Sequence, residues 1–142
     1  MSVGDWKWFA LGSAFFAGLT AVLAKVGVKD LPSNLATLIR TVVILIFLIG
    51  LVWSRNEWRP VNSWDARSLV FLVLSGLATG LSWICYYRAL QLGPASAVAP
   101  LDKLSLVVAI VLAVLFLGER LNVWQWFGAG LITAGVLLLT LK

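Results

Sequence analysis

The sequence predicts an all-α integral membrane protein built from five transmembrane helices. Of its 142 residues, 61% are hydrophobic and only 12% are charged, whereas about 25% of the residues in a typical soluble domain are charged. A soluble fold of this length needs a polar surface that this composition cannot supply. The apolar residues are gathered into long runs separated by short polar breaks, which is typical of helices that cross a bilayer. We therefore expect one membrane domain over residues 1–142, without a soluble domain.

Five windows are long and apolar enough to cross a bilayer, which needs roughly 20 mostly apolar residues. The expected spans are residues 8–25, 35–53, 68–90, 95–117 and 122–141. The first window could also be interpreted as a secretory signal. However, its apolar run is long for a signal, no A-x-A cleavage pattern follows it, and four more spans come after it. We therefore expect the first window to form a transmembrane helix.

Polar and turn-forming residues mark the four breaks between these windows. The first break is the turn Asp30–Asn34, and the second and longest is Arg55–Arg67. Gly93–Pro94 ends the third window and begins the fourth, because proline fits the first turn of a helix. The tight turn Gly118–Arg120 separates the last two windows. These breaks are short, so consecutive helices cross the membrane in opposite directions.

The composition also excludes several kinds of chemistry. The chain has no His and a single Cys, Cys85, which argues against a His/Cys metal site, Ser–His or Cys–His catalysis, and an internal disulfide. The excess of 11 Lys and Arg over 6 Asp and Glu is small and scattered, so it does not indicate a nucleic-acid-binding surface. We expect no metal, no cofactor, no enzymatic activity and no nucleic-acid partner.

Lys and Arg residues are divided evenly between the two sides of the predicted membrane domain. Apart from Arg40, which lies within the second window, five lie on the side that holds the N-terminus and five on the opposite side. The positive-inside rule orients a protein by an excess of these residues, so two interpretations stay open. Either the chain has one orientation and the window boundaries differ by a residue or two, or it inserts in both orientations. Seven of the eight Trp residues lie on the N-terminal side, which fits both interpretations.

An odd number of spans has a structural consequence. Many transporters are built from two inverted-topology repeats around a site near the bilayer midplane. Two copies of a five-span unit reproduce such a pair when they insert in opposite directions. The sequence therefore predicts one half of a ten-helix inverted-repeat transporter, completed by a second copy in an antiparallel homodimer.

Arg40 is the clearest charge inside a predicted span. Only 14 uncharged residues separate it from Arg55, too few to cross a bilayer. The second helix must therefore include Arg40, roughly 7 Å inside its start. Ala36 and Thr37 make the helix face around Arg40 small and polar, which favours an Arg40 side chain that turns toward other helices. The alternative is a side chain that reaches back to the lipid headgroups.

The same arithmetic places Asp102 and Lys103 in the membrane or in a water-filled cavity. Only 15 uncharged residues separate Lys103 from Glu119. Asp102 lies on a small, polar helix face, whereas Lys103 lies on a bulky face from which it can reach the headgroups. Pro100 removes a backbone donor and is expected to kink this helix. We expect Asp102 to form a buried ion pair with Arg40.

The third window carries aromatic residues at the depth of these charges. They either pack in the ordinary way or form the wall of a pocket that holds a few convergent polar groups. The candidate residues for substrate binding or the pathway are Arg40, Asp102, Trp83, Tyr86, Tyr87, Arg88, Lys103 and Lys25.

Two other sets of residues are expected to be structural. Glu119 and Arg120 lie in a tight turn, where they would cap helix ends or pair across the turn. Small residues in the third and last windows permit close packing of helices or of two copies. The residues expected at such contacts are Gly76, Gly80, Gly128, Gly130 and Ala134.

Several stretches of the chain resemble a known membrane repeat. The third window ends in a YxxALxxG stretch, Tyr86–Gly93, and the LGERL turn is Leu117–Leu121. The APLDKLS stretch, Ala99–Ser105, lies between them, and Gly128–Leu139 is rich in small residues. With Arg40 in the second window, these features resemble the EamA-type repeat of the drug/metabolite transporter superfamily over essentially the whole chain.

The resemblance implies a transporter fold of two such repeats, ten spans in all. This chain carries one repeat, so it is most similar to the single-repeat bacterial/archaeal transporter branch, which implies a dimer. The small multidrug-resistance pumps of the superfamily differ, because they have four spans and an essential acid in the first. Here the first window has no acid, which argues against proton-coupled export of lipophilic cations.

The leading functional prediction is a secondary transporter, an exporter or exchanger, of small polar or charged metabolites in the inner (plasma) membrane. The alternative is a small accessory membrane protein that packs onto another membrane protein without transporting. Intramembrane charges on small-residue faces favour transport, because a scaffold could use wholly apolar helices. The expected partners are a second copy of the chain, a small-molecule substrate and the lipid bilayer.

Overall fold

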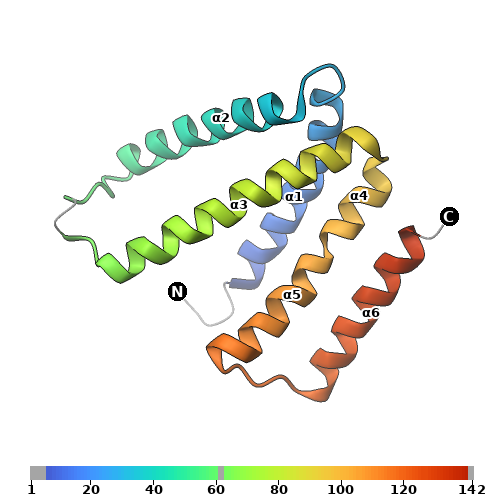
Figure 1. The fold of residues 1–142 in the computed structure, drawn as a ribbon. Coiled ribbons are helices and arrows are strands. Elements are labelled where there is room, and N and C mark those ends of the chain that lie inside the picture. The colour runs from blue at the N-terminus through green and yellow to red at the C-terminus, as the bar shows by residue number, and fades with distance from the viewer. Residues whose placement is uncertain (1–5, 61–62, 141–142) are drawn as a thin grey trace. The chain divides into compact units, whose positions relative to one another are not determined.

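Five helical spans joined by short connections make up the chain (Figure 1). The computed structural model describes residues 6–60 and 63–140. Each span is long and apolar enough to cross a membrane, which confirms the predicted all-α, five-span fold. The elements are α1 (Trp6–Gly27), α2 (Ser33–Ser54), α3 (Ala66–Leu92), α4 (Ala95–Asp102), α5 (Leu104–Leu112), the short π-helix η2 (Ala113–Leu117) and α6 (Val123–Thr140).

The helix ends lie within a few residues of the expected windows. The third helix extends two residues beyond its window at each end, from Ala66 to Leu92 rather than from 68 to 90. It includes Arg67 and Arg88 near its two ends, where long cationic side chains can reach the membrane surface. The last window was expected to reach residue 141, which lies outside the described residues.

The described residues form two compact units. One unit is Ala24–Leu92, which holds the last residues of α1 together with α2 and α3. The other contains the remainder of α1 together with α4, α5, η2 and α6. The Arg40 site belongs to the first unit and the Asp102–Lys103 pair to the second.

In the first unit, α2 packs against α3. The small α2 residues Ala36 and Thr37 are buried, as expected for a helix face that turns toward other helices. The Thr37 hydroxyl donates a hydrogen bond to a carbonyl oxygen one turn earlier, at 2.9 Å, so this buried polar group is satisfied. On α3, Tyr87 and Leu90 are 4% and 0% exposed. The tightest packing of this unit therefore lies near the C-terminal end of α3.

Two polar side chains tie the ends of α1 and α3 together. The Lys25 ammonium donates a hydrogen bond to the carbonyl oxygen of Leu90. The Gln91 amide donates to the carbonyl oxygens of Val28, at 3.3 Å, and Leu31, at 2.7 Å. Carbonyl groups at a helix end have no partner within the helix. These side chains therefore satisfy backbone groups beside the most buried residues of the unit.

In the second unit, α4 and α5 pack against α6. Ala129 and Val136 are buried and lie two helical turns apart, so they define one face of α6. Thr133 and Thr140 each donate a side-chain hydrogen bond to the carbonyl oxygen four residues earlier, at 2.9 and 3.1 Å. These two hydroxyl groups are therefore satisfied within the helix itself.

The fourth span is divided just after Pro100 (Figure 1). Helix α4 ends at Asp102 and α5 begins at Leu104. The Lys103 N–H donates to the Pro100 carbonyl oxygen at 2.9 Å, and the Leu106 N–H donates to the Lys103 carbonyl oxygen at 3.0 Å. This three-residue spacing is that of a tightened turn. Proline lacks an N–H and crowds the preceding turn, whereas this interruption lies three residues after Pro100.

The fourth span ends in the π-helix η2, and Gly118 then turns the chain away. Gly118 has a φ of +68°, the left-handed conformation that glycine adopts without a steric cost. The Glu119 N–H donates to the carbonyl oxygen of Ala113 at 3.3 Å and closes the helix end. The tight turn therefore lies where the LGERL pattern predicts it.

Candidate functional site

Arg40 of α2 lies against aromatic rings of α3. Its Cζ atom is 4.2 Å from the centroid of the Trp83 ring and 5.7 Å from that of the Tyr87 ring, within the range of cation–π interactions. Arg40 is seven residues into α2, which places its backbone roughly 10 Å from the helix start and roughly 5 Å from its middle. Of the two orientations left open by the sequence, the side chain adopts the one that turns toward α3.

The predicted aromatic residues are close together in this unit. Trp83 and Tyr87 lie one turn apart on α3 and contact the same guanidinium group. The Tyr86 ring meets the Tyr87 ring edge-on, with centroids 6.3 Å apart and planes at 68°. Tyr87 is buried, whereas Trp83, Tyr86 and Arg40 are half-buried. The aromatic wall and the cation thus form one cluster, and its role in substrate binding stays a prediction.

The cations at this end of the unit make different kinds of contact. The Lys25 ammonium is bonded to a backbone carbonyl of α3. Arg88 donates from Nη1 to Oε1 of Gln91 at 3.1 Å. For Arg40, the described residues of Ala24–Leu92 provide the two rings and no hydrogen-bond acceptor. Its N–H donors are therefore left unused within this unit.

Asp102 forms an ion pair with the residue next to it. The Lys103 Nζ atom is 3.6 Å from Oδ2 of Asp102, and the two side chains are 48% and 36% exposed, respectively. Both lie at the interruption between α4 and α5. Arg40 belongs to the other unit, so the expected ion pair between Arg40 and Asp102 stays a prediction.

The glycines expected at helix contacts have open space around them. A Cβ atom added to Gly76 or Gly80 of α3, or to Gly128 or Gly130 of α6, would meet no neighbouring atom within 4 Å in the part of the chain that the structure describes. Gly130 and Ala134 are exposed on α6. These residues are therefore not needed for close packing within either unit, and their contact with a second copy stays a prediction.

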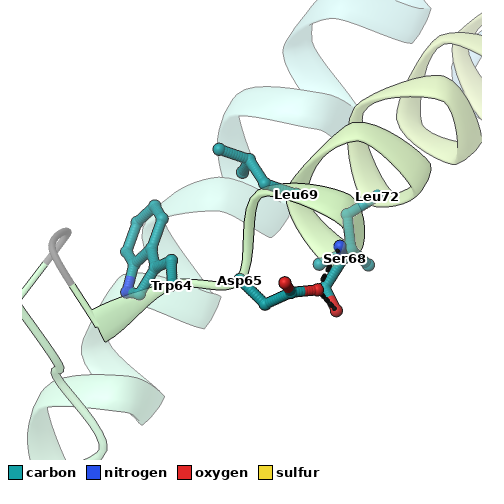
Figure 2. Close-up of a pocket in the computed structure, with 5 residues that line it drawn as sticks. All are labelled: Trp64, Asp65, Ser68, Leu69 and Leu72. Atoms are coloured by element: carbon teal, nitrogen blue, oxygen red, sulfur yellow. Dashed lines mark hydrogen bonds between the residues drawn. The ribbon is translucent and has the colours of Figure 1, made fainter.

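A pocket lies at the start of α3 (Figure 2). Its lining residues are Trp64, Asp65, Ser68, Leu69 and Leu72. The Asp65 carboxylate accepts hydrogen bonds from the backbone N–H and from the hydroxyl of Ser68, both at 2.8 Å, and so caps the helix. These bonds, the backbone one first, hold the pKa of Asp65 below its ordinary value. The pocket combines the Trp64 ring with a charged helix cap.

Two further features were not predicted from the sequence. Asn122 and Gln125 cap α6 reciprocally: the Gln125 N–H donates to Oδ1 of Asn122 at 2.9 Å, and the Asn122 N–H donates to Oε1 of Gln125 at 2.8 Å. The signal was present, because Asn-x-x-Gln precedes an apolar run. The other feature is a second pocket after α2, for which the sequence has no local pattern comparable to Asn-x-x-Gln. It is lined by Ile49, Trp53, Asn56 and Trp58.

Glu119 and Arg120 lie in the connection before this cap, and both are exposed. The sequence predicts that they cap helix ends or pair across the turn, and this role stays a prediction. The Glu119 backbone N–H and the Asn122–Gln125 pair form hydrogen bonds at these two helix ends.

Comparison with known proteins identifies the repeat that these five helices form. Residues 6–141 match the EamA-like transporter family. The chain belongs to this family. The match covers all five spans, so the resemblance carried by the YxxALxxG stretch and the LGERL turn is confirmed. No solved structure matches the chain.

Three relatives illustrate the range of this EamA-like chain's similarities. It is 54% identical over 135 residues to "Uncharacterized transporter in cobO 3'region" of Sinorhizobium sp, which covers 95% of this chain and 96% of the relative. It is 31% identical over 87 residues to "Probable 4-amino-4-deoxy-L-arabinose-phosphoundecaprenol flippase subunit ArnE" of Aeromonas salmonicida, covering 61% and 74%. It is 30% identical over 135 residues to "Uncharacterized transporter YwfM" of Bacillus subtilis, covering 92% and 44%.

The family and these relatives define the class of the protein. The EamA-like chain is a membrane transporter with five spans, a multi-pass protein of the inner membrane. These three relatives are named as transporters or as a flippase subunit, which indicates transport rather than enzymatic catalysis.

Proposed function

We propose that this EamA-like chain is a secondary transporter, an exporter or exchanger, of small polar or charged metabolites. The observation that carries the proposal is the position of Arg40, a cation inside a span, over the rings of Trp83 and Tyr87. Ionisable groups inside membrane spans are costly and are typically found on substrate or ion pathways. The chain has no nucleotide-binding motif, so a solute gradient or an exchange reaction would drive transport.

Candidate pathway residues are found in each of the two units. Arg40, Trp83, Tyr86, Tyr87 and Arg88 belong to the α2–α3 pair, as does the ordered Lys25 at the end of α1. Asp102 and Lys103 contribute the interruption of the fourth span. Interrupted helices are common elements of substrate sites in transporters.

We further propose that two copies form an antiparallel homodimer with the pathway between them. Five spans correspond to one of the two inverted repeats of such transporters. In support, the chain aligns along 92% of its own length with 44% of the longer Bacillus relative, as one of two repeats would. The exposed small residues Gly130 and Ala134 offer a surface on which a second copy can pack closely.

Uptake by reconstituted protein tests the transport proposal. Proteoliposomes are loaded with an unlabelled mixture of amino acids, sugar phosphates, carboxylates and organic cations, and exchange of each labelled class is measured. Protein-dependent exchange of at least one class, above protein-free liposomes, is the expected result. Failure to exchange any of them in both orientations of the gradient would contradict it.

Labelling of a single thiol tests the dual insertion. The exposed Cys85 is replaced in Cys85→Ser, and Glu57→Cys adds a thiol to the exposed connection after α2. An impermeant thiol reagent applied to intact cells should modify about half of the molecules if insertion has no preferred direction. Labelling of nearly all or of none would show one orientation and exclude the antiparallel dimer.

The second candidate is an accessory subunit that does not transport by itself. It is favoured by the name of the Aeromonas relative, a flippase subunit. Two differently tagged copies expressed together distinguish the candidates. Copurification of both tags together with exchange activity supports the homodimer. Separate tags together with inactive proteoliposomes support the accessory role.

A further inference from the structure

We infer that the N–H edge of the Arg40 guanidinium binds an anionic group of the substrate, a carboxylate or a phosphate, while the rings of Trp83 and Tyr87 hold the guanidinium in place. This inference rests on the proposed transport function and adds a substrate class to it. It combines four features of the α2–α3 pair: the ring contacts, the unused donors, the depth of the charge and the local excess of cations.

The ring contacts leave the hydrogen-bonding capacity of Arg40 intact. The Cζ atom lies over the Trp83 ring at 4.2 Å, and the Tyr87 ring adds a second contact at 5.7 Å. A guanidinium group is planar and carries five N–H donors around its edge. Attraction to a π system acts on the charge and does not require those donors. The rings can therefore position Arg40 while its edge stays available.

The edge has no acceptor within its own unit. Arg88 in the same region donates to the side chain of Gln91, and Lys25 donates to a backbone carbonyl. Among the described residues of Ala24–Leu92, no carboxylate, amide or carbonyl oxygen accepts from Arg40. Arg40 therefore differs from Lys25 and Arg88 because its N–H donors are available to an anion.

The depth of the charge makes an anionic partner favourable. Arg40 lies roughly 10 Å along α2 from its start, in a helix whose other residues are uncharged. A cation in such surroundings loses much of its hydration, and ring contacts offset only part of that loss. An anion that binds at the edge compensates the charge directly and gives the unused N–H donors an acceptor in an apolar environment.

The surrounding charges favour an anion over a cation. The ends of helices near Arg40 in this unit carry three more cations, Lys25, Lys29 and Arg88, against one acid, Asp30. Asp30 is exposed in the connection between α1 and α2. An excess of one sign around a concave or apolar site raises the local concentration of ions of the opposite sign.

The geometry of the guanidinium fork favours a planar or tetrahedral oxyanion. Two parallel N–H groups match two oxygens of a carboxylate or phosphate. Because Tyr87 is 4% exposed, its ring is fixed by packing, so Arg40 is held in place before the ligand arrives and binding costs less conformational entropy. The anionic group can come from a soluble metabolite or from a lipid headgroup, and separate arms of one experiment distinguish these sources.

Thermal unfolding of the full chain in an uncharged detergent tests the inference. The probes are sodium succinate and sodium phosphate, compared with sodium chloride at matched ionic strength, with choline chloride as the cation control. Phosphatidylglycerol added to the micelles forms the lipid arm. A bound anion at ten times its Kd should raise the Tm by roughly 4 °C. A response to the soluble anions assigns a metabolite, and a response to the lipid alone assigns a headgroup.

Variants of the cluster locate the response. Arg40→Gln should abolish the anion-dependent shift, and Arg40→Lys should weaken apparent anion affinity about tenfold because the fork is lost. Trp83→Leu keeps the cation but removes its main ring, and it should also weaken affinity about tenfold. Arg67→Gln is the matched control: the Arg67 Cζ atom lies 6.0 Å from the Phe71 ring at the opposite end of α3, so its loss removes the same charge and the same kind of contact. Its anion response should equal that of the parent.

Three results would overturn the inference. One is an anion response that is absent from the parent, or one that is as strong in Arg40→Gln and Arg40→Lys as it is in the parent. Another is stabilisation by choline and not by the anions. The third is a parent that ignores anions while Asp102→Asn responds to them, because the Asp102 carboxylate would then occupy the Arg40 edge. If Arg40→Gln does not fold, the Arg40→Lys and Trp83→Leu responses decide the question.

The exchange assay separates failure of this inference from failure of the transport proposal. Exchange of neutral or cationic compounds by a protein without an anion response would leave the transport proposal standing and contradict the substrate class. An anion response that needs Arg40, in a protein without exchange activity, would support the binding site and contradict transport by the chain alone.

Discussion

The two units of the chain each place a charge inside an apolar span, and they accommodate it differently. Helix α2 continues without interruption past Arg40, whose guanidinium is held over rings of α3. The fourth span is interrupted at its charges, and Asp102 pairs with the adjacent Lys103. Aromatic faces are negative and attract cations, so rings can hold Arg40 but cannot replace a cation beside Asp102.

This difference suggests different roles for the two units. Arg40 has donors available for binding, and the interruption at Lys103 is a point at which the fourth span can bend. The N–H edge of Arg40 has no acceptor among the described residues of its unit, whereas Asp102 already has an ionic partner. Conversely, the interruption at Lys103 divides a span into two shorter helices. We therefore expect substitutions in the α2–α3 pair to act on binding, and substitutions at the interruption to act on the transport cycle.

The largest effect is expected from Asp102→Ala. The described helices contain one acidic residue, Asp102, and its loss leaves a cation inside the span without a partner. Exchange activity in proteoliposomes should fall at least about tenfold, and the Tm should fall as well. An Asp102→Ala protein as stable and as active as the parent would remove Asp102 from the mechanism.

A double substitution shows which cation Asp102 serves. If the Arg40–Asp102 ion pair predicted from the sequence forms, Arg40→Ala with Asp102→Ala should recover stability lost in Asp102→Ala, without recovering transport. If the Arg40 edge is kept for substrate, the stability effects of the two single substitutions should add. Lys103→Ala with Asp102→Ala is the matched cycle for the pair seen at the interruption.

The next effect is expected from Trp83→Ala on the other side of the comparison. Loss of the ring that lies nearest to Arg40 should weaken substrate binding about fivefold or more, and binding should fall more than stability does. Trp124→Ala is a suitable control, because Trp124 is 80% exposed at the start of α6. Equal losses of binding and of stability in Trp83→Ala would indicate a packing role only.

A smaller effect, on stability, is expected from Gln91→Leu. The change removes both hydrogen bonds from the Gln91 amide to the carbonyl oxygens of Val28 and Leu31 and should cost about 2 kcal/mol of unfolding free energy. Gln91→Glu keeps an acceptor for Arg88 but places a carboxylate oxygen against the two carbonyl oxygens, so it should also lower the Tm. An unchanged Tm in Gln91→Leu would show that the connection between the ends of α1 and α3 does not stabilise the unit.

The sequence predicted the spans well because their signal is simple. Hydrophobic length and turn residues are read directly from the chain, so the five spans lie within a few residues of their expected bounds. The charge arithmetic also placed Arg40 inside α2 correctly, because it depends only on the distance to Arg55. Pro100 predicted that the fourth span would not be a single regular helix, and α4 ends at Asp102.

The contacts of the site were harder to predict because they depend on how helices pack. Periodicity grouped Arg40 with Ala36 and Thr37, but it could not show that Trp83 of another helix lies 4.2 Å from Arg40. The sequence favoured an acid as the partner of Arg40, since opposite charges are the simplest pairing, and that ion pair stays a prediction. The contact with the rings was not predicted. The cap formed by Asn122 and Gln125 had a readable local pattern, so it could have been found.

The smallest effect concerns the helix caps that begin one long helix in each unit. In α3 the cap is the charged Asp65, whose pKa is lowered by the hydrogen bonds from the Ser68 N–H and hydroxyl. In α6 it is the neutral Asn122. A lowered pKa in the folded state means that the contribution of Asp65 to stability is complete above its ordinary pKa. That contribution declines as the pH falls below the ordinary value, and it is lost once the pH falls through the lowered folded-state value.

Asp65→Asn should therefore flatten the acid side of the stability profile, while Asn122→Ala should lower stability by about 1 kcal/mol at every pH. Thermal unfolding of the three proteins between neutral pH and the acid limit of the detergent measures both effects. Ser68→Ala removes the hydroxyl bond and keeps the backbone bond, so it should reduce the pH dependence without abolishing it. The same pH profile in the parent and in Asp65→Asn would show that this cap is not ionised when it stabilises α3, and the electrostatic difference between the two caps would disappear.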